Sequence, residues 1–261
     1  MTTPAPAPLD VKLMNLSASV LFVVFALLLL GTLAGMAVRH SMFALRGISV
    51  TGEVTHNNAL TLRANVTPHL SGTFWTIDLA ATRLAFEAVP WVRQAVVQRE
   101  FPNRLRVQLQ EHKAVAYWGI EGESRLVNSL GEVFEANVGE VESEALPRLH
   151  GAGVQAAPVL AMYQLLQPLF EAMDRSIEQV ELTARGGWRV RLDGGGALEL
   201  GAGSSAEVLA RTQRFLKTLT QVTSRYGRTP EALEAADLRH EDAYAIRLRG
   251  VTTRVLSVKG K

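Results

Sequence analysis

Glu111 and His112 are adjacent ionisable residues, and a carboxylate beside an imidazole is a pairing typical of general acid–base catalysis. They follow directly on a stretch from Arg104 in which apolar and polar residues alternate, as they do in a β-strand. Because neighbouring side chains of a strand point to opposite faces, the two groups cannot act on one substrate atom. The pattern therefore predicts the solvated end of a strand rather than an active site.

The rest of the chain shows no clear pattern for catalysis or metal binding. GxSxG, HExxH and Walker sequences are absent. The other histidines are scattered without the spacing of metal ligands: His40, His56, His69, His150 and His240. The sequence leaves open a pair of carboxylates that the fold brings together. We predict no catalytic, cofactor-binding or metal-binding residues, and no cofactor.

Two glycine-rich stretches resemble phosphate loops. Gly194 to Gly196 lies between alternating segments, which favours a hairpin turn. The stretch "GAGSS" precedes a helical pattern but lacks the lysine that would meet a phosphate. Ser204 or Ser205 together with Glu207 predicts a helix cap there, and anion binding at the helix start is the alternative.

Composition excludes several classes of protein. The 261 residues contain 27 Lys and Arg against 25 Asp and Glu, a formal net charge of +2. This balance argues against a nucleic-acid partner, which selects a concentrated basic face. The absence of cysteine excludes disulfides, zinc–thiolate sites and thiol catalysis.

An apolar stretch from 13 to 38 contains no charged residue and predicts a transmembrane helix. About 20 apolar residues suffice to cross a bilayer core of about 30 Å. Lys12 and Arg39 bracket the stretch, where their side chains can reach lipid headgroups. A cleaved signal peptide is the alternative, although the apolar run is long for one. The flanking charges leave the orientation open. Residues 1–12, rich in Pro and Ala, are expected to form an unfolded tail.

Residues 43–112 predict the order strand, helix, helix, strand, strand. Ile48 and Val50 alternate with small or polar residues, and the segments 91–100 and 104–112 alternate likewise. The first helix is expected after a cap at Asn57 or Asn58, with apolar positions at Leu60, Leu62 and Val66. The second is expected after Asp78, with Leu79, Leu84 and Phe86 on its apolar side.

Residues 113–255 predict a mixed, β-rich domain, followed by a short tail at 256–261. Short strands are expected around a turn at Gly131, and a three-strand meander is expected over 177–201. Helices are expected over 157–173 and about 206–226. The last strand pair, near 233–238 and 243–248, is expected at an open edge of the sheet.

The stretch "VPWVRQAVVQREFPNRLRVQLQEHKAVAYW", together with "FALRGISVTGEV", resembles the FtsQ/DivIB family of bacterial cell-division proteins. The resemblance covers nearly the whole chain. It implies an α+β architecture: one transmembrane helix, a POTRA domain (β-α-α-β-β) at 43–112, and the β-rich domain with its open edge.

The resemblance also implies partners and site residues. Members of the family bind FtsB, which is joined to FtsL, near their last strands and a "DLR" stretch, which here is Asp237-Leu238-Arg239. The family often has an aromatic residue next, where this chain has His240; Tyr244 is a substitute. Arg185 resembles a family arginine on the neighbouring strand. The residues expected to contact the partner are Arg185, Asp237, Arg239, His240, Tyr244, Ile246, Arg247 and Leu248.

These observations favour a non-enzymatic scaffold of the division machinery, the divisome. The resemblance implies an inner-membrane protein at the division septum, with a cytoplasmic N-terminus and periplasmic domains. It would link early and late division proteins through the POTRA domain and the transmembrane helix, and help control septal peptidoglycan synthesis through FtsB and FtsL. The alternatives are a membrane-anchored periplasmic cell-wall enzyme and a translocation factor with a POTRA domain; too few strands follow for a β-barrel.

Overall fold

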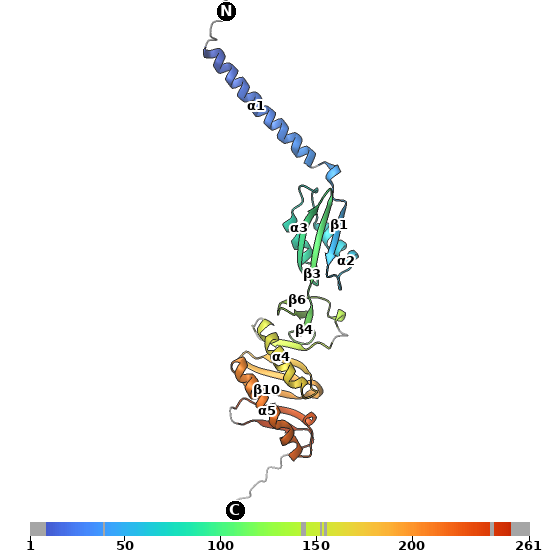
Figure 1. The fold of residues 1–261 in the computed structure, drawn as a ribbon, viewed down its shortest axis with the longest axis vertical. Coiled ribbons are helices and arrows are strands. Elements are labelled where there is room, and N and C mark those ends of the chain that lie inside the picture. Colours follow the sequence, from blue (N-terminus) through green and yellow to red (C-terminus); the bar gives the residue numbers. More distant parts are fainter. Residues whose placement is uncertain are drawn as a thin grey trace, which may run out of the picture. The chain divides into compact units, whose positions relative to one another are not determined.

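The structure is a computed structural model that describes residues 9–38, 40–141, 145–151, 153, 156–240 and 243–251. Contacts within the chain divide it into two units, residues 1–111 and 112–261 (Figure 1). The predicted tails lie mostly or wholly outside the described residues, as does Arg39.

Helix α1 runs from Leu9 to Val38. Its segment Leu13–Val38 is long and apolar enough to cross a membrane, and no residue of its most apolar window is buried. Apolar side chains exposed all around a helix match a lipid environment rather than a protein core. The helix therefore fits a single-pass membrane anchor.

The first unit contains a three-stranded sheet in the order β1-β3-β2. Its elements follow the predicted order: β1 (Gly47–Gly52), α2 (Ala59–Val66), α3 (Leu79–Glu87), β2 (Val92–Glu100) and β3 (Arg104–Glu111), with short 3₁₀ helices η1 (Ser41–Phe43) and η2 (Thr67–His69). Strand β1 runs parallel to β3, and β2 runs antiparallel to β3. The strand–helix–helix–strand–strand prediction is confirmed.

Local capping explains where the two helices begin. The Asn58 side chain accepts a hydrogen bond from the Thr61 N–H, and the Asp78 side chain accepts bonds from Ala80 and Ala81. Both residues thus satisfy N–H groups that a helix start leaves without a partner.

The apolar sides of α2 and α3 differ in part from the prediction. Leu62, Val66 and Phe86 are buried as expected. Leu60 is 78% exposed and Leu84 is 59% exposed, so neither belongs to the core. Both helices are short, and each buries only a few side chains against the sheet. The predicted positions are two and four residues apart in α2 and five and two apart in α3, so neither set follows the three- and four-residue spacing of one helix face.

Glu111 is not the solvated strand end that the sequence predicts. It is 7% exposed, and its carboxylate accepts hydrogen bonds from the N–H groups of Thr55, His56 and Asn57 and from the Asn57 side chain, at 2.7–3.0 Å. Burial raises the pKa of this carboxyl, but the bonds from His56, Thr55 and Asn57 outweigh it, and the net pKa lies below its ordinary value. Glu111 thus ties the loop after β1 to the end of β3.

His112 begins the second unit and has a structural role of its own. Its ring stacks on Phe134 with 4.1 Å between ring centroids, and its Nδ1 lies 2.9 Å from the Asn128 amide nitrogen. Glu111 and His112 therefore serve different units, and they do not form an acid–base pair.

The described part of the second unit forms a nine-stranded mixed sheet in the order β12-β11-β10-β9-β8-β7-β4-β5-β6. The strands are β4 (Ala114–Trp118), β5 (Arg125–Asn128), β6 (Val133–Glu135), β7 (Arg148–Gly151), β8 (Ile177–Leu182), β9 (Gly187–Leu192), β10 (Ala197–Ala202), β11 (Leu233–Asp237) and β12 (Ala245–Leu248). The helices are α4 (Ala156–Glu171) and α5 (Ser205–Arg225), with 3₁₀ turns η3 (Val138–Glu140), η4 (Asp193–Gly195) and η5 (Pro230–Ala232). The predicted meander is β8–β9–β10, all antiparallel.

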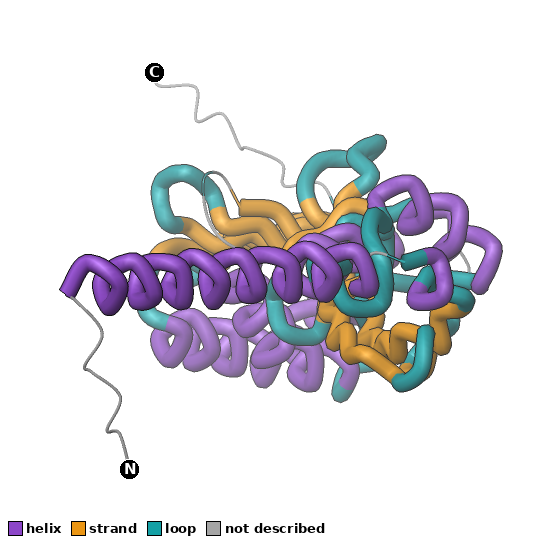
Figure 2. The backbone as a smooth tube through the Cα atoms, turned by 90° about the horizontal axis from the view of Figure 1, so that it is seen from above, coloured by secondary structure: helices purple, strands orange, loops and turns teal. Residues whose placement is uncertain are grey.

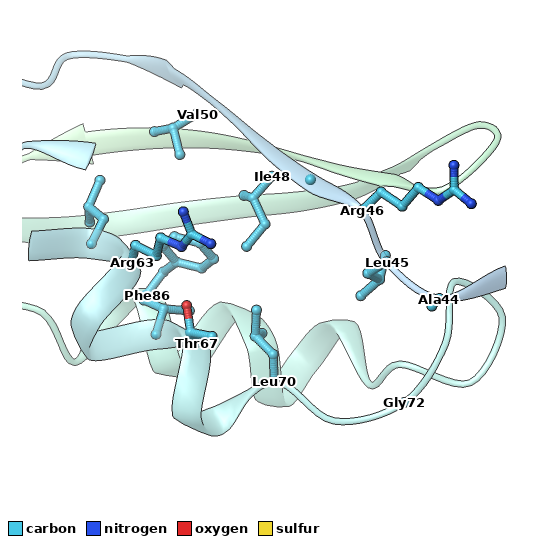
Figure 3. Close-up of a pocket in the computed structure, with 13 residues that line it drawn as sticks. Ala44, Leu45, Arg46, Ile48, Val50, Arg63, Thr67, Leu70, Gly72 and Phe86 are labelled. Carbon is cyan, nitrogen blue, oxygen red and sulfur yellow. The ribbon is translucent and has the colours of Figure 1, made fainter. Parts of the chain in front are cut away.

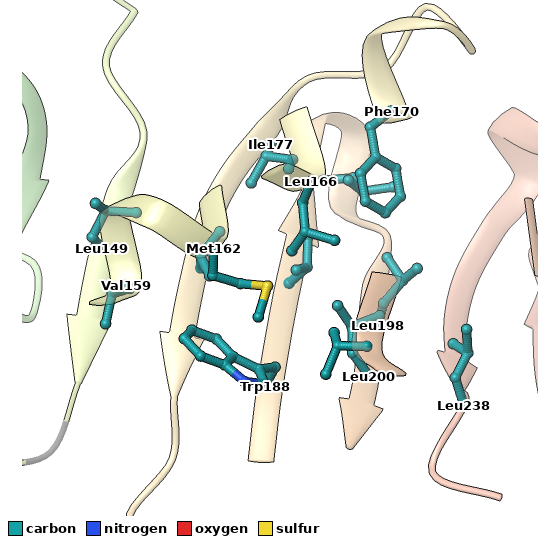
Figure 4. Packing of buried hydrophobic residues seen from close by; sticks show 14 of the residues in the cluster. Leu149, Val159, Met162, Leu166, Phe170, Ile177, Trp188, Leu198, Leu200 and Leu238 are labelled. Atoms are coloured by element: carbon teal, nitrogen blue, oxygen red, sulfur yellow. The ribbon is translucent and has the colours of Figure 1, made fainter. Parts of the chain in front are cut away.

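Helices α4 and α5 pack on one face of this sheet and enclose its core (Figure 2). Met162, Leu166 and Phe170 of α4 lie toward the strand residues Trp188 and Leu198 (Figure 4). The other face carries charged side chains: those of Arg189, Glu181 and Glu199 form ion pairs across three strands. The alternating pattern of these strands therefore places one face in the core and the other in solvent.

The predicted cap at the start of α5 is confirmed as a capping box. The Ser204 side chain accepts from the Glu207 N–H, and the Glu207 carboxylate accepts from the Ser204 N–H at 2.7 Å. A carboxylate of the chain itself thus occupies the helix start where the alternative placed a bound anion.

Candidate partner-binding edge

Strand β12 forms one border of the nine-stranded sheet. It pairs antiparallel with β11, with Asp237 opposite Ala245, Ala236 opposite Ile246 and Ala235 opposite Arg247. Among the described residues, no strand lies on its other side. The predicted open edge near the C-terminus is therefore present in the fold.

The pairing of β11 indicates which backbone groups of β12 face outward. The N–H of Leu238 donates to Glu199 of β10, and successive residues of a strand direct their polar backbone groups to alternate sides. The backbone N–H and C=O of Ala236 therefore also point toward β10, while those of Asp237 and Ala235 point toward β12. Their partners Ala245 and Arg247 face β11 in turn, so the N–H and C=O of Ile246 point away from the sheet.

The side chains of β12 alternate between core and solvent. Leu248 is buried and Ile246 packs partly against the core, while Ala245 and Arg247 are exposed. The side chain of Arg247 is 72% exposed and lies 3.8 Å from the Glu234 carboxylate, too far for a hydrogen bond. Its guanidinium can therefore turn to a carboxylate of another chain at small cost.

A hollow of about 290 Å³ lies at the start of β12, between α5 and residues 238, 240, 243 and 244. From α5 it is lined by Arg211, Arg214, Phe215 and Thr218, and from the strand side by Leu238, His240, Ala243 and Tyr244. The Tyr244 hydroxyl lies 2.6 Å from the Thr218 hydroxyl, and its ring meets Phe215 edge to face at 5.1 Å. Tyr244 is thus held in place as one wall of the hollow.

Asp237 and Arg239 are bonded to each other at the end of β11. The Arg239 guanidinium donates to both carboxylate oxygens of Asp237, at 2.5–3.0 Å. These side-chain hydrogen bonds lower the pKa of Asp237 to about 2. Asp237 thus orients Arg239, whose side chain remains 62% exposed.

Arg185 lies in the turn between β8 and β9, not on the strand next to β12 as expected. Strands β10 and β11 separate β9 from β12, a distance of about 14 Å at a strand spacing of about 4.8 Å. The strand directions nevertheless place Arg185 at the same end of the sheet as Arg239 and Tyr244, because β9 and β12 both begin there. The other seven predicted residues lie on β11 and β12 or just beside them, and the side chain of one of them, Leu248, is buried in the core.

Sequence reasoning missed the contribution of α5 to this site. Arg211, Arg214, Phe215 and Thr218 recur at helix positions i, i+3, i+4 and i+7, a spacing that places them on one face. This spacing is visible in the sequence, but no local pattern indicates that this face of α5 lies opposite Leu238, His240 and Tyr244. Within the described residues, no group of three or more His, Asp or Glu side chains is placed to hold a metal ion.

Two family models match this chain, one in each unit. The family model "POTRA domain, FtsQ-type" matches residues 43–112, and "Cell division protein FtsQ/DivIB, C-terminal" matches residues 116–239. "Cell division protein FtsQ" of Burkholderia pseudomallei is 38% identical over 97% of this chain and 98% of its own length. Proteins of the same name from Thiomonas arsenitoxydans and Bordetella pertussis are 36% and 34% identical, covering 95% and 92% of this chain and 91% and 92% of their own length. The similarity thus extends through α1 and both units.

Proposed function

The chain belongs to the FtsQ/DivIB family of cell division proteins, and on that basis we propose that it is a divisome scaffold whose β12 edge binds FtsB, joined to FtsL. The family is non-enzymatic, which removes the alternative of a cell-wall enzyme. The observation that carries the proposal is the unpaired border of β12, at which a strand of the partner adds to the sheet.

Backbone groups and side chains both support strand addition at this border. The outward N–H and C=O of Ile246 offer hydrogen bonds to an added strand. Arg239 and Arg247 are exposed on either side of this point, and the hollow beside Tyr244 adds Arg211 from α5. An added strand with carboxylates beside it would therefore gain charge-assisted bonds as well as backbone pairing.

The proposal also covers the domain boundaries, the membrane orientation and the other partners of the chain. We place the POTRA domain at residues 43–112 and the β-rich domain at 113–255. The end of the POTRA match at 112 supports this boundary, while the division of contacts after Glu111 assigns His112 to the second unit. The N-terminus is cytoplasmic and both domains are periplasmic. The POTRA domain and α1 meet other division proteins at the septum, and binding of FtsB and FtsL helps to control septal peptidoglycan synthesis.

A matched pair of substitutions at Ile246 tests the edge. Ile246→Pro removes the outward N–H and leaves the bonds of Ala245 and Arg247 to β11, whereas Ile246→Ala loses side-chain packing but keeps the N–H. With the full chain in nanodiscs and a periplasmic segment of FtsB, we expect the proline variant to lose binding and the alanine variant to bind within several-fold of the original chain. Hydrogen exchange of residues 243–251 should slow when the segment is added to the original chain.

Two results would contradict the proposal. One is unchanged binding by the Ile246→Pro variant. The other is an edge already protected from exchange in the free chain that gains nothing from the partner. In cells, depletion of the protein should give filaments, and normal septation would exclude the division role.

A further inference from the structure

A groove of about 620 Å³ opens in the first unit between β1 and helix α2 (Figure 3). Ile48 and Val50 of β1 form one wall, and residues of α2 and its 3₁₀ extension form the other. Leu62 and Phe86, both buried in the core, lie at its base. The groove is thus an opening through which a side chain of another molecule can reach the apolar interior of this domain.

The strand beside the groove is an edge of its sheet. Within the part of the chain that the structure describes, strand β1 pairs with β3 alone, so alternate backbone groups along 47–52 face away from the sheet. Just before β1, Ala44 already pairs with Thr73, which closes that end. Ile48 is 37% exposed, a large apolar side chain left uncovered beside unpaired backbone. An added strand would cover both.

The charge around the groove is positive. Arg46 and Arg63 line it, both are exposed, and no ion pair of either guanidinium is recorded in the described part of the chain. None of the described residues that line the groove is Asp or Glu, and three carboxylates of the same unit are engaged within it: Glu87 with Arg83, Glu100 with Arg106, and Glu111 with the loop at 55–57. The two arginines therefore remain available to carboxylates from outside.

We propose that this groove docks an extended peptide of a partner protein, in which alternate residues are apolar and carboxylates flank the apolar stretch. The apolar residues enter the groove beside Ile48, the peptide backbone pairs with β1, and the carboxylates meet Arg46 and Arg63. A second copy of this chain is disfavoured, because pairing β1 with β1 would bring like charges together. The inference rests on the proposed role of the POTRA domain in contacting other division proteins, and it is independent of β12.

The position of β1 close to the membrane anchor limits which partner segments can reach the groove. It begins nine residues after α1 ends (Val38 to Gly47), so the connecting chain reaches at most about 30 Å. A groove on so short a tether to a membrane anchor is within reach of segments that lie just outside the bilayer. The partner segment is therefore expected next to a membrane span of another anchored protein.

A set of three labelled nine-residue peptides tests the proposal on the full chain in nanodiscs. The first alternates valine and threonine between terminal aspartates, the second has the same centre between terminal lysines, and the third has serine for each valine. By fluorescence anisotropy we expect the first to bind at least about tenfold more tightly than the other two, a ratio set by apolar contact and charge together. Hydrogen exchange should slow along residues 47–52 when the first peptide binds.

A charge swap supplies the variants. Arg46→Glu with Arg63→Glu should weaken the aspartate peptide by about tenfold and strengthen the lysine peptide. Lys217→Glu with Arg225→Glu, two exposed α5 positions of the second unit, makes the same change in net charge and should leave both affinities unchanged. All four side chains are exposed, and none forms an ion pair with another described residue, so both variants should fold.

The outcomes separate this inference from the role of β12. Binding of the aspartate peptide by the Ile246→Pro variant, as tightly as by the original chain, supports an independent groove. Equal binding of the aspartate and lysine peptides, exchange protection at β12 instead of β1, or no measurable binding of the first peptide by the folded chain overturns the inference. None of these results alters the expected capture of FtsB at β12.

Discussion

Replacing Glu111 by alanine should destabilise the POTRA domain selectively. The carboxylate accepts four hydrogen bonds from Thr55, His56 and Asn57, which lie more than 50 residues earlier in the chain. Glu111 itself is 7% exposed. After truncation, Thr55 and His56 are exposed enough to bond water, but Asn57 is 6% exposed and loses the acceptor of its N–H. The Asn57 side chain keeps its bond to the Pro90 carbonyl.

The size of the effect follows from those partners. A buried donor left without an acceptor costs about 1–3 kcal/mol, and the lost bonds to a charged acceptor raise the total to about 2–4 kcal/mol. A domain of this size has a total stability of only several kcal/mol, at about 0.05–0.15 kcal/mol per residue. The midpoint of thermal unfolding of the POTRA domain should therefore fall by roughly 10–30 °C.

Hydrogen exchange by mass spectrometry on the full chain measures the two domains separately. Exchange should accelerate throughout 47–111 and stay unchanged in β8, β9 and β10. Glu111→Gln should be nearly as harmful as alanine, because the amide NH₂ would meet donors of the loop. Glu53→Ala, which removes an exposed carboxylate just before the same loop, is the matched control and should have little effect.

The pH dependence gives a second check. The folded pKa of Glu111 lies below the ordinary value of 4.5, so its stabilisation is complete above that pH and is lost as pH falls through the folded pKa. The difference between the original chain and Glu111→Ala should be constant from about pH 6 to 8 and narrow below about pH 4.5. A difference under about 0.5 kcal/mol at pH 7, or an equal loss in Glu53→Ala, would refute the reasoning.

Three further changes have defined outcomes. Gly201→Ala should destabilise the second unit and weaken FtsB binding, because Gly201 has φ +81° and an added Cβ would lie 3.2 Å from the Arg239 Cα; an unchanged melting temperature and affinity would contradict this. Ser204→Ala should lower the stability of the second unit by about 1 kcal/mol in urea unfolding through loss of the capping box, and an effect on the first unit would be unexpected. Gly52→Ala should unfold the POTRA domain, since φ is +106° and an added Cβ would overlap the Leu109 carbonyl oxygen; a normal circular dichroism spectrum and melting curve would count against it.

Local features of the sequence predicted most elements of this protein. The alternation in β3 and in the β8–β10 meander, the caps at Asp78 and Ser204, and the uncharged run of α1 each arise within a few neighbouring residues. A period of two or of 3.6, and a cap that bonds two or three residues ahead, are set by backbone geometry alone. The element order, and with it the family resemblance, therefore followed from sequence.

Tertiary structure decided which side chains are buried and which partners they contact. Glu111 reads as a solvated strand end because its partners lie more than 50 residues earlier, and Leu84 reads as core although its side of α3 faces solvent. The hollow beside Tyr244 and the groove beside β1 each join segments distant in sequence. Periodicity indicates that a helix or strand has a buried face and an exposed face. Which element covers the buried face depends on contacts between distant parts of the chain, and these contacts form only when the strands take their order in the sheet.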